Sequence, residues 1–266
     1  MVYKGSKARI AKYIIPILNN IIKINNCDTF IDFCCGGANI VANPHFHIQC
    51  NNKFGYDKNK YLIALINKVK NENLEYIPIT EEEYYKIRYS YENGEYEDWF
   101  VAYVGLFFSY GGAFFETFAK TIPKNDRGRI RNFGIERYKN ILKQKEQFQN
   151  VIFKEKDIFE IDVNDYNNKT LIYIDPPYYK TRKFRGFSFN HNKFWEKARE
   201  LSRNSIVVVS EYIAPDDFIS IFDLKLISNI NIAKSRKEVT EKLFVHKDYW
   251  WKIEKYNKNF SQLSLI

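Results

Sequence analysis

The sequence has no long apolar run, few turn-forming residues and few cysteines. Its 266 residues include 11 glycines and 7 prolines, which excludes a collagen-like or low-complexity chain. No stretch approaches the roughly 20 apolar residues that span a bilayer, and the basic N-terminus lacks the apolar core and cleavage site of a signal peptide. Four cysteines (Cys27, Cys34, Cys35 and Cys50) do not make a disulfide framework in a chain of this length. We therefore expect a globular, cytoplasmic protein that does not enter a membrane.

The charge and aromatic content suggest a class of partner without defining it. Lys and Arg total 41 against 32 Asp and Glu, for a net charge of +9, and 17% of the residues are aromatic. Basic and aromatic side chains together suit a partner rich in phosphates and stackable bases. Solubility and a Lys- and Asn-rich composition explain the same charge, and charge alone favours that simpler explanation.

The order of predicted elements is that of an α/β protein. Apolar residues at Ile10, Ile14, Leu18 and Ile21 recur at helical spacing. Strand and helix patterns then alternate, as in a parallel sheet covered by helices. We predict helices at 7–24, 58–70, 134–148 and 191–203, and strands at 28–37 (running into a glycine turn), 52–57, 151–159, 170–175, 205–212 and 241–247.

Residues 79–150 interrupt this alternation. They begin with a polar, acidic and Tyr-rich stretch, continue with an aromatic run at 100–115, and contain a basic loop at 120–131. We interpret them as a subdomain inserted into a domain made of residues 1–78 and 151–266.

The tetrapeptide Asp175-Pro176-Pro177-Tyr178 follows a strongly apolar strand. Ligands of open α/β sheets bind beyond the carboxyl ends of the strands, so this segment is placed where a site is expected. Proline lacks a backbone donor, which leaves the Asp175 carboxylate and the Pro176 carbonyl as acceptors beside the Tyr178 ring. Such a set suits an exocyclic amino group on a stacked heterocycle. The alternative is an ordinary proline turn in which Asp175 caps a helix.

A glycine turn follows the first predicted strand, in the sequence Asp32-Phe33-Cys34-Cys35-Gly36-Gly37-Ala38-Asn39. Paired glycines allow a ligand to approach the backbone closely. Because the G-x-G-x-x-G spacing that cradles phosphates is absent, an adenosyl ligand without phosphates fits better than a nucleotide diphosphate. An ordinary turn between strand and helix remains the alternative.

Two acidic residues end the neighbouring strands. Asp57 can bind ribose hydroxyls or cap the helix at 58–70. Asp157 can bind an adenine amino group or cap a turn. The cluster His45, His47 and Cys50 matches no standard zinc spacing, so we expect packing or surface roles and no metal.

Together these residues resemble the Dam-type family of DNA adenine-N6 methyltransferases that use S-adenosyl-L-methionine (AdoMet), particularly its orphan and phage-borne members. The resemblance begins at residues 3–7 and continues through the turn at 34–38 and Asp57. It includes the segments 109–120, 131–144, 175–181, 210–218 and 240–247. The order of AdoMet turn, insertion and DPPY is similar to the family's α group, in which the insertion recognises the target.

The resemblance implies a Rossmann-like methyltransferase sheet with an inserted, mainly helical target-recognition subdomain. It assigns catalysis to Asp175, Pro176, Pro177 and Tyr178. It assigns AdoMet binding to Tyr3, Lys7, Asp32, Cys34, Gly36, Asp57, Asp157 and Asp175, with Lys7 on the methionine carboxylate. The family's turn often reads F-x-G-x-G, whereas Cys34 and Ala38 stand at the aromatic and last glycine positions here, so neighbouring Phe33 is a candidate replacement for the missing ring.

The implied substrate is double-stranded DNA whose target adenine flips out of the helix. Candidate DNA contacts are the insertion residues Lys124, Arg127, Arg129, Arg131 and Arg137, and Arg182 and Lys183 after DPPY. The runs around 180–185 and 234–237 are further candidates, and for any single residue a solvated face is the simpler explanation.

Three other functions share parts of this pattern. DPPY-like turns also serve RNA adenine and DNA cytosine-N4 methyltransferases, and a non-catalytic DNA-binding protein could keep the fold. The segments at 109–144 argue against the first two, and the intact DPPY, Lys7 and Asp57 argue against the third. A cognate restriction endonuclease is a partner that the resemblance allows, while the recognised sequence, the oligomeric state and the role of Glu211 are left open.

Overall fold

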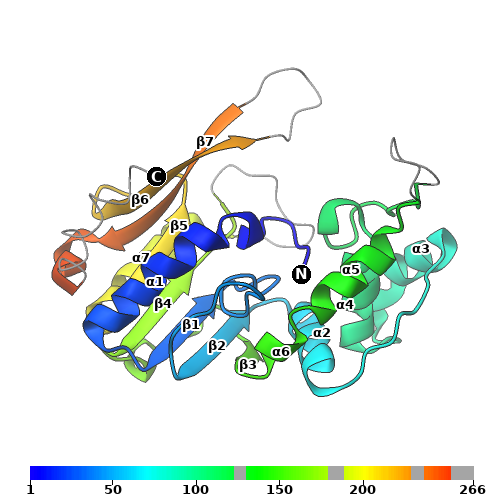
Figure 1. The fold of residues 1–266 in the computed structure, drawn as a ribbon, viewed down its shortest axis with the longest axis horizontal. Helices are drawn as coiled ribbons and strands as arrows, with labels where there is room; N and C mark the ends of the chain where they lie inside the picture. Colours follow the sequence, from blue (N-terminus) through cyan, green and yellow to red (C-terminus); the bar gives the residue numbers. More distant parts are fainter. Residues whose placement is uncertain (123–129, 179–188, 229–236, 253–266) are drawn as a thin grey trace.

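A seven-stranded sheet forms the centre of the computed structural model, which describes residues 1–122, 130–178, 189–228 and 237–252. Its strands are β1 (Thr29–Phe33), β2 (Asn52–Asp57), β3 (Ile152–Glu155), β4 (Thr170–Ile174), β5 (Ile206–Glu211), β6 (Phe218–Ser228) and β7 (Lys237–His246). They lie in the order β3-β2-β1-β4-β5-β7-β6, in which β3 to β5 are parallel and β7 is antiparallel to both of its neighbours. The expected α/β architecture is confirmed (Figure 1).

Helices cover both faces of this sheet because its central strands are apolar on both sides. In β1, Phe30 belongs to the core shared with α1 (Ala11–Asn25) and α2 (Lys60–Asn71), whereas Ile31 belongs to the core shared with α7 (His191–Asn204). The alternation follows from the two-residue period of a strand. The helices predicted at 7–24, 58–70 and 191–203 are therefore found, and a short 3-10 turn (Lys7–Arg9) precedes the first.

Strand β6 is an element that the sequence analysis did not identify. From Phe222 to Leu226 its apolar and polar residues alternate, but a register shift between Ser220 and Phe222 interrupts the pattern. Such a bulge places two successive residues against one partner and breaks the period of two. The strand pairs with β7 at the edge of the sheet.

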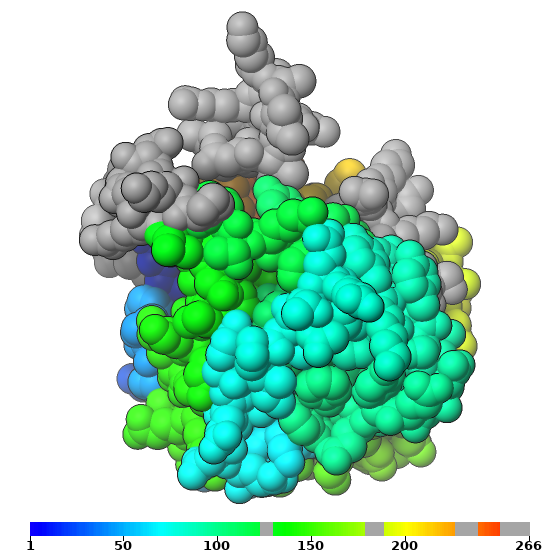
Figure 2. Space-filling model, turned by 90° about the vertical axis from the view of Figure 1, so that its right-hand side faces the viewer, coloured from blue at the N-terminus to red at the C-terminus, as the bar shows by residue number. Residues whose placement is uncertain are grey.

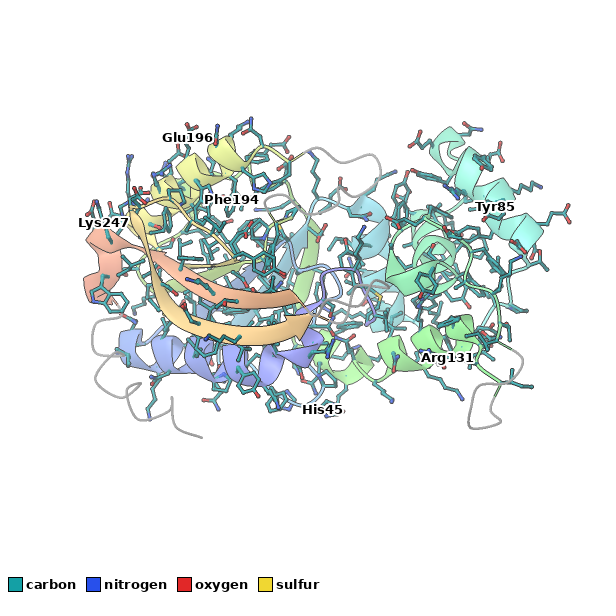
Figure 3. The ribbon with its side chains drawn as sticks, turned by 90° about the horizontal axis from the view of Figure 1, so that it is seen from above. His45, Tyr85, Arg131, Phe194, Glu196 and Lys247 are labelled. Atoms are coloured by element: carbon teal, nitrogen blue, oxygen red, sulfur yellow. The ribbon has the colours of Figure 1, made fainter. Side chains whose placement is uncertain are left out.

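The chain between β2 and β3 carries the remaining helices. They are α3 (Glu81–Ser90), α4 (Asp98–Phe107), α5 (Phe133–Leu142) and α6 (Lys145–Phe148). They gather at one end of the molecule, beside α2 (Figure 1), and form much of the face in Figure 2. Tyr85 of α3 and Arg131 lie in this helical part, well apart from Phe194 of α7 (Figure 3).

The single helix predicted at 134–148 is divided into α5 and α6. Between them lies Gln144, which is 1% exposed. Its side-chain amide donates to the carbonyl of Ala42 at 3.0 Å and contacts those of Gly37 and Ala38 at 3.4 and 3.5 Å. These contacts tie the helical region to the turn after β1 and coincide with the break between α5 and α6.

None of the helices in the described ranges is long and apolar enough to cross a membrane. The N-terminal segment lies between the carboxyl ends of the parallel strands and the helical region (Figure 1).

Candidate active site

The chain segment after β4 brings Asp175 to the point where the strand order reverses. The backbone N–H of Asp175 donates to the carbonyl of Phe33 at 3.3 Å, so the segment starts beside the end of β1. Crevices at such switch points are the usual ligand sites of open α/β sheets. Pro176 is buried and Pro177 partly buried, and neither carries a backbone donor. The predicted acceptor pair thus lies where the sequence placed it.

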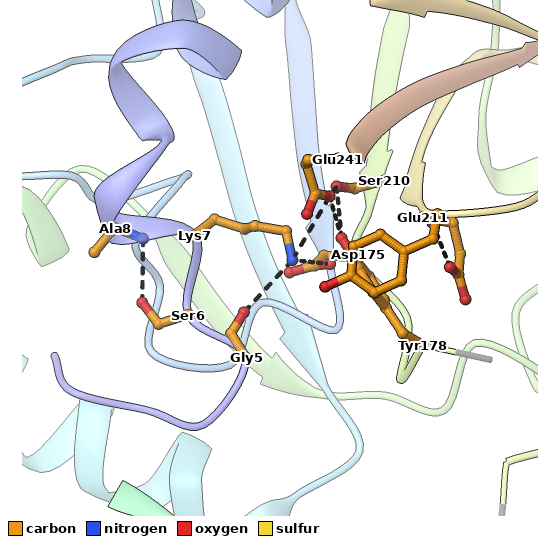
Figure 4. A network of polar contacts seen from close by, with 10 residues as sticks. Gly5, Ser6, Lys7, Ala8, Asp175, Tyr178, Ser210, Glu211 and Glu241 are labelled. Atoms are coloured by element: carbon orange, nitrogen blue, oxygen red, sulfur yellow. Dashed lines mark hydrogen bonds and ion pairs between the residues drawn. The ribbon is translucent and has the colours of Figure 1, made fainter. Parts of the chain in front are cut away.

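Lys7 is the partner of the Asp175 carboxylate (Figure 4). Its Nζ lies 2.8 Å from Oδ1 of Asp175 and 4.3 Å from the centre of the Tyr178 ring. Burial raises the pKa of Asp175 to about 6, against the opposing influence of Lys7. Burial lowers the pKa of Lys7, but the nearby Asp175 and Glu241 carboxylates outweigh it and raise the pKa overall. Lys7 is therefore a cation at neutral pH and holds Asp175 as a carboxylate.

Tyr178 is fixed by a polar cluster at the carboxyl end of β5 and the middle of β7 (Figure 4). Its hydroxyl donates to the Glu241 carboxylate and lies 3.0 Å from Oγ of Ser210, which itself donates to Glu241 at 2.6 Å. Glu241 is 3% exposed. The sequence analysis did not select Glu241, and β7 offers no local signal for it, because Glu238 and Lys242 of the same strand are also charged.

The glycine turn after β1 closes around Tyr3 and Asp57. Gly36 has φ +50°, and a Cβ there would lie 2.9 Å from two ring carbons of Tyr3. Its N–H donates to Oδ2 of Asp57 at 2.9 Å. Only glycine meets both the left-handed φ and the close approach without strain. The turn therefore brings together three residues that were predicted to bind AdoMet.

Two non-glycine residues of the same turn also have positive φ. Cys34 has φ +59° and Ala38 has φ +54°, the positions at which this sequence departs from the family pattern. Phe33, considered as a replacement ring, is instead buried and packs on Tyr56 at 5.0 Å between ring centroids. The structure therefore places Phe33 in the core rather than at the turn's surface.

The three remaining acidic candidates all bind neighbouring groups of the chain. Asp32 is 1% exposed and its Oδ2 accepts from the N–H of Val41, so it holds the loop after β1. Asp57 also accepts from the N–H of Asn59, and Asn59 rather than Asp57 caps α2. Asp157 accepts from Lys58 at 2.6 Å and from the N–H of Phe159.

These surroundings shift the pKa values of the acidic side chains in different directions. Burial raises the pKa of Asp32 and of Asp57, in the latter against two backbone hydrogen bonds. Burial of Asp157 acts in the same direction, but the hydrogen bonds from Lys58 and Phe159 outweigh it and lower the pKa. Glu211, whose role the sequence left open, is buried and accepts from the N–H of Tyr212.

Of the candidate DNA contacts, Arg131 and Arg137 are among the described residues. Arg131 is on the surface, paired with Glu136 at 3.0 Å. Arg137 is 4% exposed and donates to the carbonyls of Leu106 and Phe107, at the end of α4. The structure thus gives Arg137 a packing role instead of a surface for DNA. The other candidates lie outside the described residues: Lys124, Arg127, Arg129, Arg182 and Lys183.

His45, His47 and Cys50, the cluster considered in the sequence analysis, do not converge on a common point. His45 and His47 are exposed, and the thiol of Cys50 contacts the carbonyl of Cys27. Within the ranges that the structure describes, no group of three or more His, Cys, Asp or Glu side chains could hold a metal ion.

Comparisons with known proteins point to one family. The model of the D12 class N6 adenine-specific DNA methyltransferases matches residues 3–215. No curated protein matches the chain. Among solved structures, the chain is similar to a Pyrococcus horikoshii protein to which RNA methyltransferase activity has been ascribed. The two share 9% identity with a TM-score of 0.41, over 89% of this chain and 83% of the other.

Proposed function

The chain belongs to the D12 class N6 adenine-specific DNA methyltransferase family, and from this we propose that the cluster around Asp175 is its catalytic site. The enzyme methylates the exocyclic amino nitrogen of adenine in DNA. We assign recognition of the target amino group to Asp175 and the Pro176 carbonyl, and stacking of the base to Tyr178. The observation that carries this assignment is the partly buried Asp175 carboxylate at the switch point, 17% exposed and paired with Lys7 at 2.8 Å.

The chemistry explains why two acceptors are needed. The amino nitrogen of adenine is a poor nucleophile because its lone pair is delocalised into the ring. Hydrogen bonds from both N–H groups, to Asp175 and to the Pro176 carbonyl, localise the lone pair on nitrogen. The same acceptors stabilise the positive charge that develops there during transfer. Because Lys7 contacts Oδ1 of Asp175, Oδ2 is the oxygen assigned to the adenine.

The residues of the glycine turn fit AdoMet. Its adenosyl part carries ribose hydroxyls, from which a carboxylate such as Asp57 can accept hydrogen bonds. It carries no phosphates, so a phosphate-binding loop is not required. Because Gly36 has no Cβ, the Tyr3 ring can pack directly on it while its N–H holds the Asp57 carboxylate in the same turn. AdoMet supplies an already activated methyl group when bound. Tyr3, Lys7, Asp32, Cys34, Gly36, Asp57 and Asp157 are the residues that we assign to binding it or to shaping its site.

The helical region at 79–150 is the proposed target-recognition subdomain, and residues 1–78 and 151–266 the catalytic domain. The position of the helical region supports this assignment, because the region is inserted between β2 and β3 and lies beside the carboxyl ends of the strands. The substrate is then duplex DNA, and because a target atom within a duplex cannot be reached, the adenine flips into the site. The cytoplasm, where such DNA is accessible, is the proposed compartment.

A product assay tests the catalytic assignment. The protein is incubated with AdoMet and unmethylated genomic DNA, and the digested nucleosides are examined by mass spectrometry for N6-methyldeoxyadenosine. We expect the product from the wild-type chain and none from Asp175→Ala, while DNA binding is largely kept. Near-normal turnover by Asp175→Ala would refute the role given to this carboxylate.

A further inference from the structure

Glu241 is a buried carboxylate that the proposed reaction does not use directly. It lies on β7, which runs antiparallel to β5, and this pairing brings it to the Ser210–Glu211 end of β5. Its side chain is 4% exposed, and its Oε1 accepts from the hydroxyls of both Ser210 and Tyr178. Lys7 lies 4.0 Å from the same oxygen. Burying a charge with this many partners carries a desolvation cost that the pairing of β7 with its neighbouring strands does not require.

The contact with Tyr178 fixes the ring at its far end. Tyr178 follows two prolines, and its hydroxyl is held at the rim between β5 and β7 (Figure 4). Its ring also meets Tyr212 edge-on, with centroids 4.5 Å apart and planes at 84°. A ring held at its hydroxyl and packed against Tyr212 has one orientation, so the plane of a base that stacks on it is also fixed.

We propose that Glu241 is a positioning residue of the adenine pocket, which acts through the Tyr178 hydroxyl to orient the ring on which the target base stacks. The proposal rests on the role given above to Asp175 and Tyr178. Glu241 does not touch the base. Its effect is to hold the reacting nitrogen in line with the methyl group, a geometry on which the rate depends steeply.

A double-mutant cycle tests this role. The variants are Glu241→Gln, which keeps the shape and removes the charge, Tyr178→Phe, which removes the hydroxyl, and the two combined. Asp223→Asn is the matched control, because it neutralises an exposed carboxylate on the neighbouring strand β6, outside the cluster. Methyl transfer to plasmid DNA gives kcat and KM for each, and thermal melting shows that each variant is folded.

We expect Glu241→Gln to lower kcat about tenfold, as for a weakened charge-assisted hydrogen bond, with KM for DNA nearly unchanged because phosphate contacts dominate DNA affinity. In the Tyr178→Phe background the same substitution should cost less than about twofold, since the hydroxyl through which it acts is gone. Asp223→Asn should behave as the wild type. A full effect of Glu241→Gln in the Tyr178→Phe background, or no effect in the wild type, overturns the proposal.

Two further outcomes separate this proposal from the catalytic assignment. If Asp175→Ala keeps its turnover in the same assay, the assignment of the site fails and Glu241 falls with it. If Asp175→Ala is inactive but Glu241→Gln is normal, only the positioning role fails. Should Glu241→Gln not melt cooperatively, Tyr178→Phe decides alone. A roughly tenfold lower kcat with unchanged KM supports the proposal, and an unchanged kcat overturns it.

Discussion

A methyl group added at Gly36 should damage the enzyme in two separable ways. The first is backbone strain, because Gly36 has φ +50°. For a residue with a Cβ, the left-handed region costs about 1–2 kcal/mol, part of which is offset by the lower chain entropy of alanine in the unfolded state. The second is a clash, because the new Cβ would lie 2.9 Å from Cδ1 and Cε1 of Tyr3.

Gly94 offers a matched control for the strain alone. It has φ +77°, and a Cβ there meets nothing within 4 Å. We expect Gly94→Ala to lower the free energy of unfolding by about 1 kcal/mol, which is a fall in Tm of roughly 2–4 °C for a chain of this size. Gly36→Ala should lose the same amount plus about 1–3 kcal/mol for overpacking against the Tyr3 ring.

Thermal melting and calorimetric titration with AdoMet measure the two parts. Because the Tyr3 ring must shift, we expect Gly36→Ala to bind AdoMet at least about tenfold more weakly, equivalent to 1.4 kcal/mol, and Gly94→Ala to bind it normally. If both variants melt at the same temperature and bind AdoMet equally well, the account of this turn as a tightly packed cofactor surface is refuted.

The remaining predictions concern charge. Because protonation removes the negative charge of Asp175 and weakens it as an acceptor for the adenine amino group, and because its pKa is about 6, kcat/KM should fall about tenfold per pH unit below that value. Lys7→Met removes the cation that keeps the pKa of Asp175 from rising further, so the fall in kcat/KM should begin at a higher pH. An unchanged dependence of kcat/KM on pH in this variant would contradict the ion pair. Arg137→Met should lower stability by about 1.5–3 kcal/mol, as it removes the charged donor from the carbonyls at the end of α4, and leave the salt dependence of DNA binding unchanged. Arg131→Met should leave stability nearly unchanged and reduce by about one the slope of log DNA affinity against log salt concentration. Both assignments would be contradicted if Arg137→Met changed this slope without lowering Tm and Arg131→Met lowered Tm without changing the slope.

The central strands and the DPPY segment could be predicted from the sequence because their signals are local. Strand β4 is an apolar run with a proline pair directly after it, and no distant contact is needed to recognise it. The turn at Gly36 was predicted for the same reason. Strand β6 was missed because a bulge interrupts its alternation. The break at Gln144 was missed because its cause is a set of carbonyls about 100 residues earlier in the chain.

The partners within the site could not be predicted from local patterns. The sequence identified Lys7 and Asp175 separately, and the resemblance assigned Lys7 to the cofactor rather than to Asp175. Glu241 reaches the site only through the antiparallel pairing of β5 and β7, which no local pattern encodes. Arg137 shows the opposite case, since a basic residue near a basic loop was interpreted as a surface contact and is buried by the packing of α5 on α4.

The N-terminal segment touches both the glycine turn and the helical region. Tyr3 packs on Gly36, Lys4 pairs with Glu116 at 3.0 Å, and a Cβ on Gly112 would lie 3.1 Å from the side chain of Val2. Residues 109–116 therefore cannot shift without disturbing the residues that precede and follow Tyr3. For the proposed binding of AdoMet at the turn and of DNA at the helical region, we therefore expect linkage, which is reciprocal: by whatever factor bound DNA changes the affinity for AdoMet, bound AdoMet changes the affinity for DNA.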